Sequence, residues 1–147
     1  MQYNESEFLI ETEVPEDELI ISRTDLNGLI TYANETFCEI SGYEEDELIA
    51  KSHNIVRHPD MPQAAFADLW QTLQNKKQWT GVVKNLRKDK GFYWVKALIS
   101  GVYKNGEIVE YKSLRTPISY EEKLTYQKQY DKMRQENGEK IRKIIYE

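Results

Sequence analysis

The stretch from residue 79 to residue 118 reads WTGVVKNLRKDKGFYWVKALISGVYKNGEIVEYKSLRTPI. It is rich in β-branched and aromatic residues, which favour extended strands. Two short polar turns, at 88–91 and 104–106, divide it. Turns of this length join neighbouring antiparallel strands. The stretch therefore predicts a three-stranded antiparallel meander, with strands over 79–86, 92–103 and 107–118.

The residues before the meander predict a hairpin. Asn27-Gly28 separates two β-branched runs, at 18–24 and 29–33. Both turn residues tolerate the positive φ angles that a tight hairpin requires. The chain therefore offers five strands, two at the start of the core and three at its end.

Helices are predicted between the hairpin and the meander. Asn34 is a helix cap for a short helix that Gly42 ends, and a second short helix is expected at 44–49. A longer helix at 65–73 has apolar residues at three- and four-residue intervals, with Lys76-Lys77 expected in its last turn. The result is an α+β fold, a five-stranded antiparallel sheet with short helices on one face and a ligand pocket between them.

The composition is that of one soluble domain. The 147 residues carry a net charge of −5, and no apolar run approaches the roughly 20 residues that span a bilayer. An acidic chain without a basic stripe argues against nucleic-acid binding. The single cysteine, Cys38, excludes an internal disulfide. We expect a cytoplasmic protein that binds no nucleic acid and does not insert into a membrane.

Three zones are expected along the chain: an acidic N-terminal cap (1–17), a core domain (18–119) and a C-terminal amphipathic helix (120–147). Residues 1–22 carry seven acids and no base, which indicates a solvated arm or, alternatively, a docking surface for a partner. The tail has a narrow apolar stripe that Gly138 interrupts, formed by Tyr126, Tyr130, Met133, Asn137, Ile141 and Ile144. Such a helix docks on its own domain, on a second copy or on a partner, or frays on the flank.

Motifs of catalysis and metal binding are missing from the sequence. It contains no HExxH, GxSxG, P-loop or GxGxxG pattern. Cys38, His53 and His58 do not have the spacing of a metal site. We therefore predict that the chain is not an enzyme and holds no metal ion.

The loop at 52–62, SHNIVRHPDMP, is the strongest candidate for ligand binding. It places a cation, an imidazole and a carboxylate (Arg57, His58 and Asp60) in a proline-braced segment. Arg57 is suited to a phosphate, and His58 to stacking or donating to a ring. The alternative is a purely structural loop in which Arg57 pairs with Asp60.

A planar ligand is suggested by the aromatic side chains Trp70, Trp79, Tyr93 and Trp94, although an ordinary core uses the same residues. Asn85 is more telling. Strand alternation puts it on one face with Trp79, Gly81 and Val83, opposite Thr80, Val82, Lys84 and Leu86. A buried amide on an apolar face needs a partner, and the edge of a flavin ring offers both donors and acceptors.

Four segments resemble the PAS domains of the bacterial aerotaxis-receptor (Aer) type. They are NIVRHPDMP (54–62), AAFADLW (64–70), WTGVVKN (79–85) and YWVKA (93–97), and the similarity runs from about residue 23 to 118. The resemblance implies a PAS fold and a non-covalently bound FAD that senses redox state or oxygen. The reactive cysteine of light-sensing LOV relatives has no counterpart in the matching segment, so covalent photochemistry is not expected.

By this resemblance, the FAD-binding candidates are Asn54, Arg57, His58, Asp60, Trp70, Trp79, Asn85, Trp94 and Arg115. Trp79 and Asn85 match positions that face the flavin in related redox-sensing PAS domains. Arg115 stands where LOV relatives keep a glutamine near flavin N5.

The resemblance also implies a partner in energy taxis or aerotaxis. That partner is a membrane chemoreceptor, or a HAMP or signalling domain, either in the parent chain or in trans as for the stand-alone CetB type, which we favour. A homodimer is an additional expectation. Two alternatives stay open: a PAS sensor for haem, ligated from the His53/His58 loop, or for another small ligand, and a cofactor-free dimerisation module.

Overall fold

In the computed structural model, which describes residues 10–139, five strands form one antiparallel sheet in the order β2-β1-β5-β4-β3. The strands are β1 (Ile20–Thr24), β2 (Ile30–Ala33), β3 (Trp79–Leu86), β4 (Phe92–Lys104) and β5 (Glu107–Thr116). The first strand pairs with the last, so that Ile20 lies opposite Arg115. This arrangement confirms the predicted hairpin and meander. The pairing of β1 with β5 joins the hairpin and the meander into one sheet.

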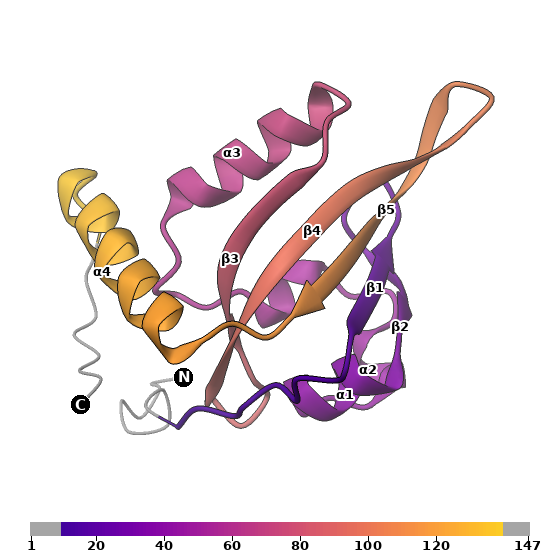
Figure 1. Ribbon diagram of the computed structural model, residues 1–147. Coiled ribbons are helices and arrows are strands. Elements are labelled where there is room, and N and C mark those ends of the chain that lie inside the picture. The colour runs from indigo at the N-terminus through magenta and orange to yellow at the C-terminus, as the bar shows by residue number, and fades with distance from the viewer. Residues whose placement is uncertain (1–9, 140–147) are drawn as a thin grey trace.

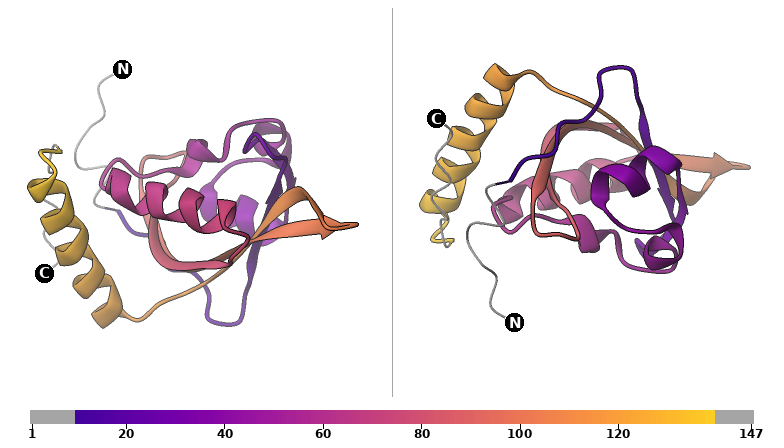
Figure 2. Two further views of the ribbon diagram at one scale, coloured as in Figure 1. Left: turned by 90° about the horizontal axis from the view of Figure 1, so that it is seen from above. Right: turned by 90° about the horizontal axis from the view of Figure 1, so that it is seen from below.

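The helices follow the predicted order. They are α1 (Glu35–Ser41), α2 (Glu45–Leu48), the 3-10 helix η2 (His53–Val56), α3 (Gln63–Gln74) and α4 (Tyr120–Glu136). The Asn34 side chain accepts a hydrogen bond from the Phe37 amide and so caps α1, while Gly42 ends it at φ 80°. Figures 1 and 2 show α3 running along β3, and α4 at the end of the molecule away from α1 and α2.

The two faces of the sheet have different coverings. Val83 and Asn85 of β3 face the helices α1 to α3, whereas Val82 and Lys84 face α4, as the alternation predicted. The core under the short helices contains Val14, Ile20, Ile30, Ala33, Phe37, Ile40, Leu48, Val56, Tyr93 and Val95. The smaller core under α4 contains Met61, Val82, Phe92, Trp94 and Tyr130.

The C-terminal helix docks on its own domain, one of the expected alternatives. Tyr130 stacks on Trp94 with ring centroids 6.4 Å apart, and its hydroxyl donates to the Val82 carbonyl. The helix ends at Glu136, before Gly138, which has φ 70°. The part of the predicted stripe at Ile141 and Ile144 lies outside the described residues.

The expected position of Lys76 and Lys77 in the last turn of α3 is wrong. The helix ends at Gln74, and Lys76 has φ 60°, a left-handed conformation that cannot continue a helix. Both lysines therefore lie in the turn before β3. Their side chains still follow the carboxyl end of the helix, where positive charge is favourable.

The described part of the acidic cap is paired with the domain. The Thr12 amide donates to the Phe92 carbonyl at 2.8 Å, and Glu11 forms a parallel bridge with Phe92. The Lys123 ammonium of α4 lies 2.6 Å from the Glu11 carboxylate and 2.9 Å from that of Glu13. These two acids hold the segment against β4 and α4. Between residues 10 and 139, no helix is long and apolar enough to cross a membrane.

Candidate functional site

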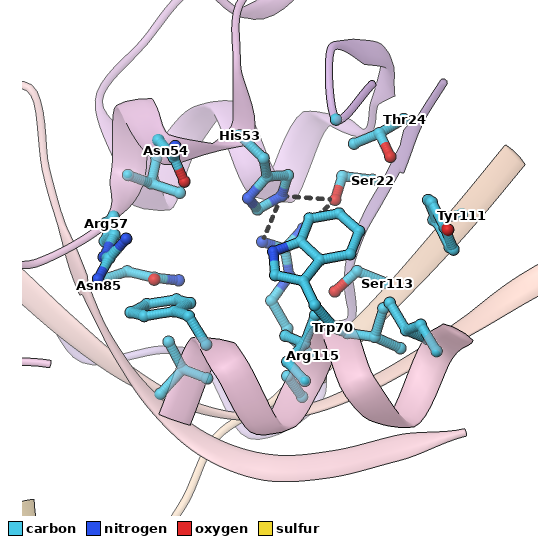
Figure 3. A pocket seen from close by; sticks show the side chains of 18 of the residues that line it. Ser22, Thr24, His53, Asn54, Arg57, Trp70, Asn85, Tyr111, Ser113 and Arg115 are labelled. Carbon is cyan, nitrogen blue, oxygen red and sulfur yellow. Dashed lines mark hydrogen bonds between the residues drawn. The ribbon is translucent and has the colours of Figure 1, made fainter. Parts of the chain in front are cut away.

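A cavity of about 120 Å³ lies between the inner face of the sheet and the helices η2 and α3. Its lining is formed by Ser22, Thr24, Gly28, His53, Asn54, Val56, Arg57, Phe66, Leu69, Trp70, Leu73, Val83, Asn85, Ala97, Ile99, Tyr111, Lys112, Ser113 and Arg115. Figure 3 shows Asn54, Arg57 and Asn85 on one side of it and Ser22, His53 and Arg115 together on another. Most of the lining surface is apolar, which suits a planar aromatic ligand.

The charge of the cavity contrasts with that of the chain. Three cationic residues, Arg57, Lys112 and Arg115, are among its lining residues, and no Asp or Glu is among those within residues 10–139. The whole chain nevertheless carries a net charge of −5. The cavity therefore has a basic lining although the protein as a whole is acidic. This positive lining favours a ligand with negative charge.

Arg115 is the deepest of these cations, because β5 places it opposite Ala97 of β4 and Ile20 of β1, and it is 2% exposed. Its Nη2 donates to Ser22 Oγ at 2.6 Å, and its Cζ lies 4.4 Å from the centre of the Phe37 ring. Its Nε has no hydrogen-bond partner within the described structure. Burial lowers the pKa of Arg115 to about 10, so it remains charged at neutral pH.

His53 contacts Arg115 and shares its hydrogen-bond partner Ser22. Its Nε2 lies 3.1 Å from Ser22 Oγ and 3.4 Å from Arg115 Nη1. Because a guanidinium can only donate, Nε2 is the acceptor and the proton of the neutral ring is on Nδ1. Burial and the nearby positive charge of Arg115 lower the pKa of His53 to about 3, so His53 is neutral at physiological pH. The ring stacks on Phe37 with centroids 5.8 Å apart.

Asn85 and Arg57 meet where the loop crosses β3. They form an isolated antiparallel bridge, and the Asn85 side chain is 5% exposed. The guanidinium of Arg57 lies over the Phe66 ring, with Cζ 3.8 Å from its centre. The backbone bridge therefore brings one amide and one cation close together in the cavity wall.

Trp70 lies at the open side of the cavity. It is 43% exposed and meets the Tyr111 ring edge-on at 5.7 Å between centroids. Figure 3 shows its indole ring in front of Arg115 and Ser22. An aromatic side chain in this position covers one face of a planar ligand and remains in contact with water.

A second hollow of about 330 Å³ adjoins the cavity, since Asn54 and Arg57 contribute to both. It is lined by Asn54, Arg57, His58, Pro59, Met61, Gln63, Leu86 and Glu139. Its lining is more polar than that of the cavity. The two hollows share Asn54 and Arg57 in their walls, so Arg57 is within reach of a ligand in either one.

Five of the nine sequence-predicted site residues line the cavity: Asn54, Arg57, Trp70, Asn85 and Arg115. His58 lines only the second hollow, where its Nδ1 accepts from the Asp60 amide at 2.9 Å. Asp60 and Trp94 lie on the α4 side of the sheet. Trp79 is buried but does not line the cavity, and its Nε1 donates to the Asp68 carboxylate at 2.9 Å.

The salt bridge that the sequence suggested between Arg57 and Asp60 is not formed. The ion pairs of the Asp60 carboxylate run instead to the cations Lys84 and Arg134, because the loop turns Asp60 to the α4 side of β3. Arg57 is thereby left to the cavity.

Sequence reasoning missed Ser22 and Phe37 as supports of Arg115. Alternation along β1 places Ser22 on the inner face, directly opposite Ser113 of β5. The sequence therefore held a signal for Ser22, but only once the pairing of β1 with β5 is known. No group of three or more His, Cys, Asp or Glu residues that could hold a metal ion occurs in residues 10–139.

The fold and the cavity define a class of protein: a small sensor-type domain in which helices close a ligand cavity over one face of a five-stranded antiparallel sheet. The family profile of the PAS fold matches residues 30–115. The chain belongs to the PAS family.

Two curated relatives are similar over most of the chain. The aerotaxis receptor of Escherichia coli is 48% identical over 76% of this chain, and the nitrogen fixation regulatory protein of Klebsiella pneumoniae is 32% identical over 74%. In both cases the match covers 22% of the relative's own length. The chain is thus a PAS sensor domain related to the aerotaxis receptor, and it corresponds to about a fifth of either protein.

Solved structures confirm the PAS fold. The PAS domain of a Colwellia psychrerythraea protein matches with a TM-score of 0.63 and 24% identity, over 68% of this chain and 86% of that one. The dark structure of the blue-light photoreceptor Aureochrome1 LOV matches with a TM-score of 0.67 and 21% identity, over 75% and 83%.

Proposed function

We propose that this domain binds FAD non-covalently in the cavity and reports the redox state of the flavin to a signalling partner. The observation that carries the proposal is the cavity itself, in which buried Asn85 and Arg115 face an apolar space that no described carboxylate lines. FAD supplies reversible electron transfer when bound. The protein supplies the fixed amide and charge that distinguish its redox states.

The donor set fits a flavin. The Asn85 side-chain amide offers one donor group and one acceptor atom to the pyrimidine edge of the ring. The Nε–H of Arg115, which has no partner in the described structure, is available to donate a further hydrogen bond. A buried guanidinium without a carboxylate is costly unless a ligand brings negative charge. Asn85 and Arg115 would hold the flavin ring, and as hydrogen-bond donors they would favour its electron-richer reduced form.

The second hollow favours FAD over FMN. Arg57 lies where the two hollows meet, so its planar fork is placed for a phosphate of the dinucleotide. The hollow beyond it has room for the polar adenosine end. The resemblance to Aer-type domains over residues 54–62 points to the same cofactor.

Haem is a weaker fit for the cavity. His53 is the histidine that lines it, and its Nε2 is already engaged by Ser22 and Arg115. An axial ligand needs a free imidazole nitrogen facing the metal. His58 lies outside the cavity and uses Nδ1 to accept from the Asp60 amide.

The partner belongs to chemotaxis, by the relation to the aerotaxis receptor. We propose a membrane chemoreceptor, or a HAMP or signalling domain in the parent chain, with a second copy of the domain as an additional contact. The domain works in the cytoplasm as a sensor and not as an enzyme. Its output element is α4, which packs on the sheet face opposite the cavity.

The proposal is tested by titrating the ligand-free protein with FAD, FMN and haemin, and following flavin fluorescence or the haem Soret band. We expect quenching of FAD fluorescence with a micromolar or lower dissociation constant, weaker binding of FMN and no specific haemin complex. Preferential binding of haemin, or no binding of either flavin, contradicts the proposal.

A further inference from the structure

The loop between η2 and α3 (residues 57–62) crosses the edge of the sheet and contacts both of its faces. On the cavity side, Arg57 forms an antiparallel bridge with Asn85. Toward α4, the amide of the preceding residue of β3, Lys84, donates to Met61 Sδ at 3.4 Å. Two consecutive residues of one strand therefore hold the loop, one beside the cavity and one beneath α4.

Asp60 carries the loop into a buried group of polar side chains, here named the Asp60 cluster (Asp60, Lys84, Gln127 and Arg134). The Asp60 carboxylate lies 3.2 Å from Lys84 Nζ and 3.5 Å from Arg134 Nη1. Lys84 Nζ also donates to Gln127 Oε1 at 3.0 Å. Gln127 and Arg134 belong to α4, so the cluster joins the loop to the C-terminal helix.

The charge balance of the Asp60 cluster depends on α4. His58 Nδ1 accepts a hydrogen bond from the Asp60 amide, so this nitrogen carries no proton. The neutral ring therefore adds no positive charge beside the carboxylate. The cations closest to Asp60 are Lys84 and Arg134, all three being buried. Asp131 of α4 also lies 3.9 Å from Arg134 Nη1, so two cations face two carboxylates, and loss of Arg134 leaves one carboxylate without a cation.

A second contact joins the C-terminal segment to the cavity wall. The N-cap of α3, Pro62, has no side-chain hydrogen bond to the helix, and the first amide, that of Gln63, donates to the Glu139 carboxylate at 3.1 Å. The same helix carries Phe66, on which the Arg57 guanidinium rests. Glu139, three residues beyond the end of α4, thus contacts the helix that carries the support of Arg57.

We propose that α4 is part of the cofactor site, and that Asp60, Lys84 and Arg134 are positioning residues that hold the loop, and with it Arg57, in the binding geometry. This inference rests on the proposed function and identifies the route from the cavity to the output helix. Binding of FAD at Arg57 and docking of α4 strengthen one another. Because such coupling is reciprocal, each changes the other by the same factor.

The test uses the full chain and two measurements: the FAD dissociation constant and amide hydrogen exchange of residues 120–136 with and without FAD. The main variant is Arg134→Met, which keeps an apolar stem but removes the charge. Arg134→Lys is the conservative rescue. Lys132→Met is the matched control, since Lys132 is on the exposed side of α4.

We expect Arg134→Met to weaken FAD binding at least about 5-fold, Arg134→Lys to restore part of the affinity, and Lys132→Met to leave it unchanged. In the unaltered chain, FAD slows the exchange of the α4 amides. Equal FAD affinity in Arg134→Met, or α4 exchange that does not respond to FAD, overturns the coupling alone. An unaltered chain that does not bind FAD overturns the proposed function and the coupling together.

Discussion

The Asp60 carboxylate and the Lys84 ammonium lie 3.2 Å apart, each with a side chain that is only 1% exposed, on the sheet face opposite the cavity. Their neighbours in sequence belong to the cavity: Asn85 follows Lys84, and Arg57 precedes Asp60 in the same loop. The loop thus crosses the edge strand β3 and contacts both of its faces. The two sides of the domain are joined by residues one to three positions apart in sequence and not by a long chain of contacts.

The pKa of Lys84 gives a pH dependence of stability with an unusual sign. Burial lowers it from 10.5 to about 8, against the attraction of Asp60. Between these two values the unfolded chain binds more protons than the folded one, so the free energy of unfolding rises with pH. The slope is at most about 1.4 kcal/mol per pH unit. Urea unfolding at pH 8.0, 8.8 and 9.5 measures it, and Lys84→Met abolishes the rise. A flat profile in the unaltered chain contradicts the burial of this charge.

Replacement of Arg115 by Met has opposite effects on the ligand-free protein and on its affinity. The substitution removes a buried cation that has no carboxylate partner among residues 10–139, so we expect the free energy of unfolding to rise by about 1–2 kcal/mol. It also removes the positive charge from the cavity, so FAD binds more weakly. Urea unfolding and fluorescence titration of the same samples check both parts. Loss of stability together with full affinity would show that Arg115 is a structural residue.

Asn85→Ala removes the amide from the inner face of β3. We expect the FAD dissociation constant to increase by about 3- to 10-fold, the usual net value of one hydrogen bond. Thr80→Ala is the matched control, because Thr80 lies on the same strand but is exposed on the other face. Fluorescence titration of both variants measures the effect. Equal affinities in the two variants exclude a contact between Asn85 and the ligand.

His53 makes the ligand-free domain sensitive to acid. Its pKa is lowered from 6.5 to about 3. Between these two values His53 is protonated in the unfolded chain but not in the folded one. Stability therefore falls as pH decreases through this window, by at most about 2 kcal/mol between pH 7 and pH 5. His53→Gln, which retains polar contact with Ser22, should show a smaller loss. Parallel acid profiles for the two proteins would contradict a neutral, buried His53.

Local patterns in the sequence predict the strands and the inner face of β3. The alternation of Asn85 and Lys84 is set by the two-residue period of a strand, and the Asn27-Gly28 turn sets the hairpin. The same period explains why Tyr93 and Trp94, adjacent on β4, cannot both face the cavity. Pairing of Trp94 with Lys84 puts Trp94 under α4, where the sequence alone had grouped it with the cofactor residues.

The position of Asp60 could not be predicted in this way. The face of the sheet on which Asp60 lies depends on how residues 57–62 cross β3. It also depends on α4, which contributes Arg134 more than 70 positions later in the sequence. The same holds for Ser22, whose role needs the pairing of β1 with β5. Such contacts depend on tertiary packing, which local propensity does not encode.

The most direct test of the account is the absorption spectrum of the protein as purified, followed by heat release and chromatography of any bound cofactor. The account predicts the two bands of an oxidised flavin and the release of FAD. A single Soret band, or a colourless protein that also fails to take up added FAD, would contradict it.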